Sequence, residues 1–146
     1  MIAFGTWDIS FYLFLKLLLG WPPSLLTWDI LFIIPVPWVG PVIAPVLVST
    51  AMIATGIWHF KRETGGTPVR LGVWNWAGIL AGAAIIILSF TLDANNVAAG
   101  GMPHSFRWPV FGVGMLVGVL GYVSAAARRE RREKAVEVRR AEATIG

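Results

Sequence analysis

The sequence contains no cysteine and few charged residues. The absence of cysteine excludes disulfide bonds, Cys-ligated zinc or iron–sulfur sites, and thiol catalysis. Charged residues make up 14% of the chain, compared with about 25% in soluble domains. Hydrophobic residues make up 56%, and the mean hydropathy is +0.69. A soluble domain of 146 residues could not bury so much apolar surface, so the composition predicts an integral membrane protein.

The chain also lacks the residue sets on which most enzymes depend. It has no paired carboxylates, no Ser/His/Asp set, no phosphate-binding glycine loop and no H-E-x-x-H motif, so we expect no enzyme activity. Basic residues are present but local, since seven of the twelve Lys and Arg lie between Arg128 and Arg140. This clustering is typical of membrane orientation rather than of nucleic-acid binding, and no nucleic-acid partner is expected.

Three uncharged stretches are long enough to cross a bilayer as helices. They cover about residues 41–60, 71–92 and 108–127. About 20 residues at a rise of about 1.5 Å give about 30 Å, which is the thickness of the hydrocarbon core. Continuous apolar runs favour helices over barrel strands. We therefore predict an all-α integral membrane protein, with a helical membrane domain over residues 1–127 and a charged cytoplasmic tail over residues 128–146, which continues the last span as a helix.

The first 40 residues allow two arrangements. Pro22 and Pro23 interrupt any helix, and Ser24 could cap a second helix over Leu25–Ile34. In one arrangement, residues 7–34 form a fourth span that is broken at the prolines. In the other, two short helices form a re-entrant or interfacial hairpin. We prefer the broken fourth span, because it uses all the apolar residues and gives an even number of spans with both termini on one side.

The motif Trp-Asp-Ile-x-Phe occurs twice, at Trp7–Phe11 and at Trp28–Phe32. An indole ring prefers the headgroup level, and a neighbouring carboxylate prefers water. We therefore interpret Trp7, Asp8, Trp28 and Asp29 as interfacial anchors, where each aspartate could also cap the next helical turn. Chance in a Trp-rich chain and an internal duplication are the alternatives. Asp8, Asp29 and Asp93 are all expected at span ends, within reach of water.

Loop charges predict the orientation of the spans. Residues 61–70 carry three basic residues and one acid, and the tail from Arg128 carries seven basic residues and four acids. Residues 93–107 carry only one basic residue. The positive-inside rule therefore places residues 61–70 and the C-terminus in the cytoplasm, as in a bacterial cytoplasmic (inner) membrane protein. Other tryptophans fit aromatic belts at the two interfaces: Trp58, Trp74 and Trp76 inside, and Trp38 and Trp108 outside.

Small residues and histidines are the remaining candidate sites. Two G-x-x-x-G motifs, with a further glycine on the same face of the last span, predict close packing between the second and third spans: Gly78, Gly82, Gly114, Gly118 and Gly121. His59 and His104 are expected at opposite membrane faces, which argues against joint haem ligation. Each could bind a pigment or haem singly, although an interfacial histidine without a ligand is the simpler interpretation. No cofactor is predicted beyond contacts with lipid.

Three functions fit these features. The leading hypothesis is a non-catalytic accessory or structural subunit of a larger membrane complex, such as a respiratory or photosynthetic one, with other membrane subunits as partners. The second is a small transporter or channel, which would have to be a homo-oligomer because four spans enclose no roomy path. It predicts a water-accessible Asp29 or Lys16. The third is a pigment or haem binder that uses one histidine.

Overall fold

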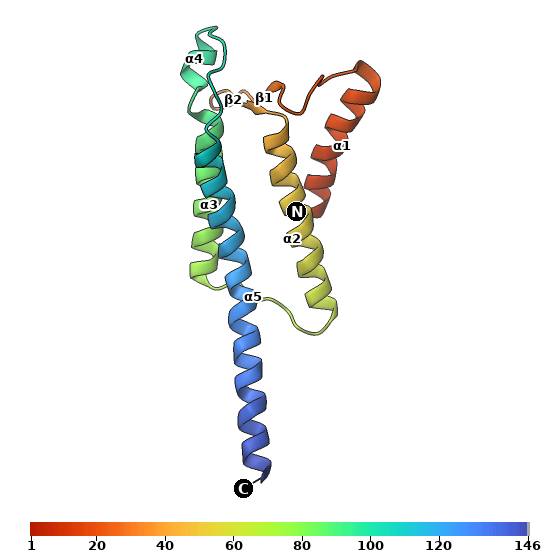
Figure 1. The fold of residues 1–146 in the computed structure, drawn as a ribbon, viewed down its shortest axis with the longest axis vertical. Helices are drawn as coiled ribbons and strands as arrows, with labels where there is room; N and C mark the ends of the chain where they lie inside the picture. Colours follow the sequence, from red (N-terminus) through yellow and green to blue (C-terminus); the bar gives the residue numbers. More distant parts are fainter. Residues whose placement is uncertain (146) are drawn as a thin grey trace.

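The fold is mostly helical, with two short strands near its N-terminal third (Figure 1). The computed structural model describes the backbone of residues 1–145 and the side chains of residues 1–125 and 127. In chain order the elements are α1 (Ile2–Leu19), β1 (Trp28–Phe32), β2 (Trp38–Pro41), α2 (Ile43–Thr64), α3 (Val73–Thr91), α4 (Ala94–Ala98) and α5 (Trp108–Ile145). Within the described residues, four helices are long and apolar enough to cross a membrane, which agrees with the predicted class.

The N-terminal region differs from both predicted arrangements. The fourth apolar helix is α1, which runs without interruption over Ile2–Leu19 and ends at Gly20 in the left-handed conformation, before the Trp21–Pro22 peptide bond. The predicted helix over Leu25–Ile34 is wrong, and so is a broken span over residues 7–34. Prolines on both sides leave too few residues for a stable helix there, and the β-branched and aromatic residues between them suit a strand.

The two strands form an antiparallel hairpin at one end of the molecule. Trp28 pairs with Pro41 and Asp29 with Gly40, and the register shifts between Ile30 and Phe32. The hairpin packs on α3, because a Cβ at Gly40 would lie 2.7 Å from the ring of Phe90. The strands pair only their facing backbone groups and leave two outer edges, which suits the end of the bundle rather than the hydrocarbon depth.

Helices α3 and α5 form one tightly packed pair. A Cβ at Gly82 would lie 2.5 Å from the backbone N of Gly118 and 2.7 Å from the carbonyl oxygen of Gly114. A Cβ at Gly78 would lie 3.1 Å from Cα of Gly121. The structure thus places the five predicted glycines in one backbone-to-backbone contact. Asn75 strengthens this pair, since its Nδ2 donates to the Gly121 carbonyl at 2.8 Å.

Helices α1 and α2 form the second pair, and sequence reasoning missed its glycines. A Cβ at Gly5 would lie 2.7 Å from the Ser49 carbonyl oxygen, and one at Gly56 would lie 2.6 Å from the Ile2 side chain. Each helix contributes one glycine to the contact, and neither glycine belongs to a G-x-x-x-G motif that would have identified it. The start of α1 therefore lies against the middle of α2, and the two helices diverge toward Leu19 (Figure 1).

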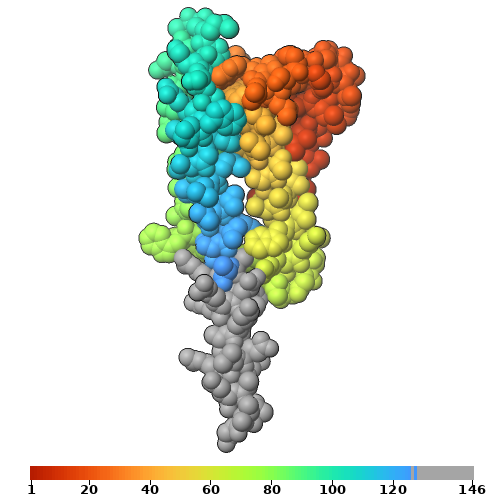
Figure 2. All heavy atoms as spheres, in the orientation of Figure 1, coloured from red at the N-terminus to blue at the C-terminus, as the bar shows by residue number. Residues whose placement is uncertain are grey.

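The two pairs meet mainly at their ends. At the hairpin end, Ala44, Phe90 and Phe111 form a buried cluster with Trp38 and Phe106 packed against it. At the other end, a second buried cluster contains Val69 and Ala125, with Trp58 and Leu71 against it. Figure 2 shows a narrow gap at mid-height between α5 and α2, in blue and yellow. This arrangement leaves space between the pairs at the depth of the candidate spans.

Helix α5 is longer than the membrane requires. Its candidate span covers Trp108–Ala125, whereas the helix continues to Ile145 (Figure 1). The extra 20 residues correspond to about 30 Å of helix. The ion pairs that the sequence suggests in this segment, between Arg129 and Glu133 and between Glu130 and Lys134, lie outside the described side chains.

We predict that Gly82→Ala destabilises the fold by about 1–3 kcal/mol, because the added methyl group has no space between the two backbones. Gly112→Ala is the matched control, since a Cβ at Gly112 meets nothing within 4 Å and alanine favours the helix. Unfolding of both variants in mixed detergent and dodecyl sulfate micelles, followed by circular dichroism, measures the difference. Equal stability of the two variants would contradict the glycine contact.

Candidate functional site: an apolar groove with two aspartates

A cavity with polar groups lies between α1, α2, α3 and the hairpin. It has a volume of about 430 Å³, is partly open to its surroundings, and is lined mainly by apolar side chains. We call it the groove. Its polar groups are the side chains of Asp8 and Tyr12 on α1, Asp29 on β1 and Ser49 on α2. A cavity of this size and character is typical of sites for small molecules.

Asp8 lies inside the helix pair rather than at a span end. It is the seventh residue of α1, and its Oδ2 accepts a 2.7 Å hydrogen bond from the Ser49 hydroxyl, itself the seventh residue of α2. Ser49 is 2% exposed, so this contact is at the buried interface of α1 and α2. Asp8 therefore lies well within a candidate membrane span, and the expectation that it sits at a span end is wrong.

Asp29 reaches the same groove from the hairpin. Its Oδ2 accepts a 2.7 Å hydrogen bond from the Tyr12 hydroxyl, and Tyr12 is buried. Tyr12 follows Asp8 by four residues on α1, so the two side chains share one helix face. Among the hydrogen bonds of the described residues, each carboxylate accepts one hydroxyl group. A carboxylate can accept about four hydrogen bonds, so both retain capacity for a further partner.

The two copies of the Trp-Asp-Ile-x-Phe motif adopt different secondary structures, which the sequence did not indicate. The first copy is helical and the second is strand β1, and the two copies bring their aspartates to one groove. Asp8 does not cap a helix, because α1 begins at Ile2. Trp7 is 64% exposed on the side of α1, whereas Trp28 packs edge-on against Phe106.

The other predicted anchors lie at the two ends of the fold. Trp38 and Trp108 belong to the aromatic contacts at the hairpin end, where Trp38 packs on Phe32 and Trp108 on Phe106. At the opposite end, Trp58 packs on Tyr122 and under the Arg62 guanidinium. The last two tryptophans, Trp74 and Trp76, are exposed in the first turn of α3 at that same end.

The groove has aromatic walls and no basic lining residue. Rings from all sides of the cavity line it: Phe4, Trp7, Phe11, Tyr12, Trp21, Phe32, Trp38 and Phe90. Lys16 is not among the lining residues, because its Nζ donates to the Pro22 carbonyl at 2.9 Å. The two aspartates therefore have no basic side chain beside them in the groove.

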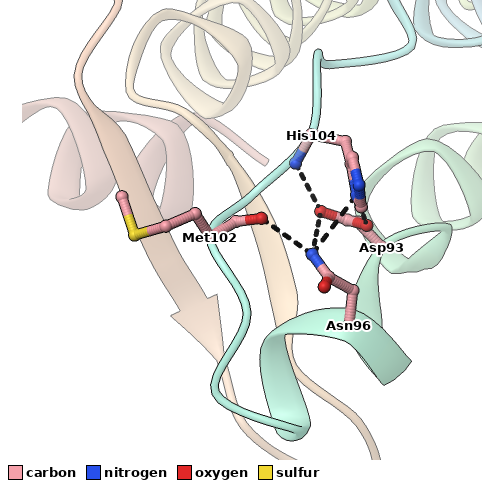
Figure 3. Close-up of polar contacts among 4 residues, drawn as sticks. All are labelled: Asp93, Asn96, Met102 and His104. Atoms are coloured by element: carbon pink, nitrogen blue, oxygen red, sulfur yellow. Dashed lines mark hydrogen bonds and ion pairs between the residues drawn. The ribbon is translucent and has the colours of Figure 1, made fainter.

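The structure does not bring the two histidines together. His59, near the end of α2, has its Nδ1 2.9 Å from the Tyr122 hydroxyl and its Nε2 3.8 Å from Glu63. His104 lies in the segment after α4 at the hairpin end. Figure 3 shows it beside Asp93 and Asn96: its Nδ1 lies 2.7 Å from an Asp93 oxygen, and its backbone N–H donates to the other.

This second cluster fastens the turn between α4 and α5. Asn96 Nδ2 donates to the Met102 carbonyl at 2.8 Å, which closes the loop that Asp93 and His104 hold (Figure 3). Within the described residues, no group of three or more His, Asp or Glu side chains is arranged to hold a metal ion. These groups hydrogen-bond to one another near the surface, so we interpret the cluster as one that stabilises the loop.

No known family model matches the chain, and neither a curated protein sequence nor a solved structure matches it. The groove and its contacts are therefore the observations from which a function can be argued.

Proposed function

We propose that this protein is a small, non-catalytic membrane carrier that works as a homo-oligomer and takes its ligand into the groove. The observation that carries this proposal is the pair of carboxylates, Asp8 and Asp29, in one apolar cavity between the spans. Ionisable groups at membrane depth are costly and mark ligand or ion pathways in most membrane proteins. A purely structural helix bundle could fill the same positions with apolar residues.

The arrangement of the helices supports movement as well as binding. The α1–α2 pair and the α3–α5 pair are each packed through glycines, and the groove lies between them. Two rigid pairs that meet mainly at their ends can rock against each other without breaking either glycine contact. Such rocking would alter access to Asp8 and Asp29. Because the groove is partly open, a second copy of the chain would complete the path.

The proposal places the C-terminus and residues 61–70 in the cytoplasm. Residues 61–70 begin at the end of α2 remote from the hairpin, and α5 continues beyond its span at that same end (Figure 1). Residues 93–107 lie at the opposite end. The positive-inside rule then assigns the basic end to the cytoplasm and the hairpin to the outer face.

We predict that cysteines introduced at Thr64 and Thr144 react with a membrane-impermeant maleimide only from the cytoplasmic side. A cysteine at Met102, which is 86% exposed, should react from the outer side. The natural chain has no cysteine, so the unmodified protein is a clean control. Labelling of intact cells and of inverted vesicles measures the two sides. Reaction of positions 64 and 144 from opposite sides would overturn this topology.

For transport, we predict protein-dependent, saturable uptake of an amphiphile into proteoliposomes. The probes are three compounds of similar shape: methyltriphenylphosphonium (cation), triphenylphosphine oxide (neutral) and tetraphenylborate (anion). At least one should enter faster than in protein-free liposomes at zero membrane potential. If the phosphonium is the probe that enters, Asp29→Asn should lower its initial rate at least about tenfold, since a negative charge that attracts the cation is lost. Asp93→Asn, which alters a carboxylate outside the groove, should not. Unchanged uptake of all three probes would contradict the carrier.

A second candidate is an accessory subunit of a larger membrane complex, and the length of α5 favours it. The ribbon of α5 continues for about 30 Å beyond its span and lies apart from the other elements in Figure 1. A helix that is polar on all sides is stable when it bridges to a partner or when many i,i+4 charge pairs support it, and the proposal takes the first case. Such a helix is suited to docking a soluble domain of another subunit.

If the accessory role is correct, other polypeptides should co-purify with the chain in mild detergent, and removal of residues 128–146 should release them. The shortened chain keeps the candidate spans and the groove, so residues 1–127 should remain as helical as they are in the full-length protein. Mass spectrometry of the tagged full-length and shortened proteins measures the difference, with the tag at the N-terminus. A chain that purifies alone as a homo-oligomer would exclude this role and agree with the carrier.

A further inference from the structure

We infer that the groove binds a lipophilic organic cation that enters from the bilayer, with its charge between Asp8 and Asp29 and its apolar body against the aromatic walls. This inference rests on the proposed function in taking the groove as the ligand site, and it adds the chemical class of the ligand. Charge, shape and surroundings each support it.

The first argument is charge. The 19 lining residues include two carboxylates and no Lys, Arg or His. The two carboxylates share a mainly apolar cavity, and Asp8 lies within a candidate span, where an unpaired charge away from water is unfavourable. The Ser49 and Tyr12 hydroxyl groups provide one neutral hydrogen bond each, at 2.7 Å. A positive charge on the ligand would supply the compensation that the chain itself does not place there.

The second argument is the lining. An inorganic divalent cation such as Ca²⁺ takes six to eight oxygen ligands, but this groove is mainly apolar and, among the described residues, no cluster of three metal-binding side chains occurs. Aromatic rings attract organic cations through the negative faces of their π-systems. Trp7, Phe11 and Tyr12 lie on α1 beside Asp8, and Trp38 and Phe32 lie on the hairpin beside Asp29. The walls therefore suit a charge that carries its own apolar shell.

The third argument is access and size. A volume of about 430 Å³ is in the range of sites that hold drug-sized ligands. The cavity is partly open, and the helices that line it, α1, α2 and α3, are all candidate membrane spans. A ligand dissolved in the bilayer would therefore enter between these helices. A neutral lipid chain would fill the same space, but it would leave both carboxylates without a charged partner.

Equilibrium dialysis of the purified full-length protein against radiolabelled methyltriphenylphosphonium tests the inference. We expect saturable binding of the labelled phosphonium. Excess unlabelled phosphonium should displace it, whereas triphenylphosphine oxide at the same concentration as the unlabelled phosphonium should not. Asp8→Asn and Asp29→Asn should each weaken binding about tenfold or more, because each removes one charge that faces the ligand. Asp93→Asn is the control for loss of a carboxylate outside the groove and should bind like the natural protein.

Further variants separate charge from folding. Asp29→Glu should restore most of the affinity that Asp29→Asn loses. Ile87→Lys, which places a cation in the wall while leaving both aspartates in place, should abolish phosphonium binding. Circular dichroism and gel filtration identify any variant that does not fold. Only the folded variants are compared for phosphonium binding.

The outcomes separate this inference from the carrier proposal. Binding of phosphonium without uptake would support the cation site and overturn the carrier. Uptake of only the neutral or the anionic probe would support the carrier and overturn the cation site. Equal affinity for phosphonium and phosphine oxide, or full affinity in folded Asp8→Asn and Asp29→Asn proteins, would also overturn the cation site.

Discussion

The structure depends on one constraint: a polar group placed between membrane helices must find its partner within the protein. The Asp8–Ser49 hydrogen bond joins α1 to α2, and the Asp29–Tyr12 hydrogen bond joins the hairpin to α1. Asn75 does the same for α3 and α5. Ser49, Tyr12 and Asn75 are buried, so each contact fixes the relative position of two elements. These contacts determine where the groove forms and which groups line it.

Glycine contacts and polar contacts have different roles in this arrangement. The close approach of α3 and α5 at Gly82 and of α1 and α2 at Gly5 makes two rigid pairs. Between the pairs, side-chain clusters around Phe90 and around Val69 provide contacts at the two ends. Backbone contacts leave no space for a ligand, whereas the separation between the pairs does. The groove is thus a consequence of packing that is close within pairs and sparse between them.

The sequence predicted the parts of the fold that depend on local composition. Long apolar runs identified α2, α3 and the membrane part of α5, because span length and hydrophobicity are properties of each segment alone. The hairpin was missed because Leu25–Ile34 is short, and a short apolar run is ambiguous between helix and strand. Its strand state depends on pairing with Trp38–Pro41, which is a tertiary contact. A stronger weighting of β-branched residues between prolines would have favoured the strand.

The groove could not be predicted from the sequence, although its two aspartates could be identified there. The repeated Trp-Asp motif identified Asp8 and Asp29, but solvent preference alone assigns both aspartates to the interface. What moves Asp8 into the bundle is Ser49, 41 residues away along the chain, and what gives Asp29 its place is Tyr12. A hydroxyl group on the facing helix changes the environment of a carboxylate from water to protein. Two such carboxylates, each with a hydroxyl partner and with no basic side chain among the described lining residues, are the basis of the inferred cation site.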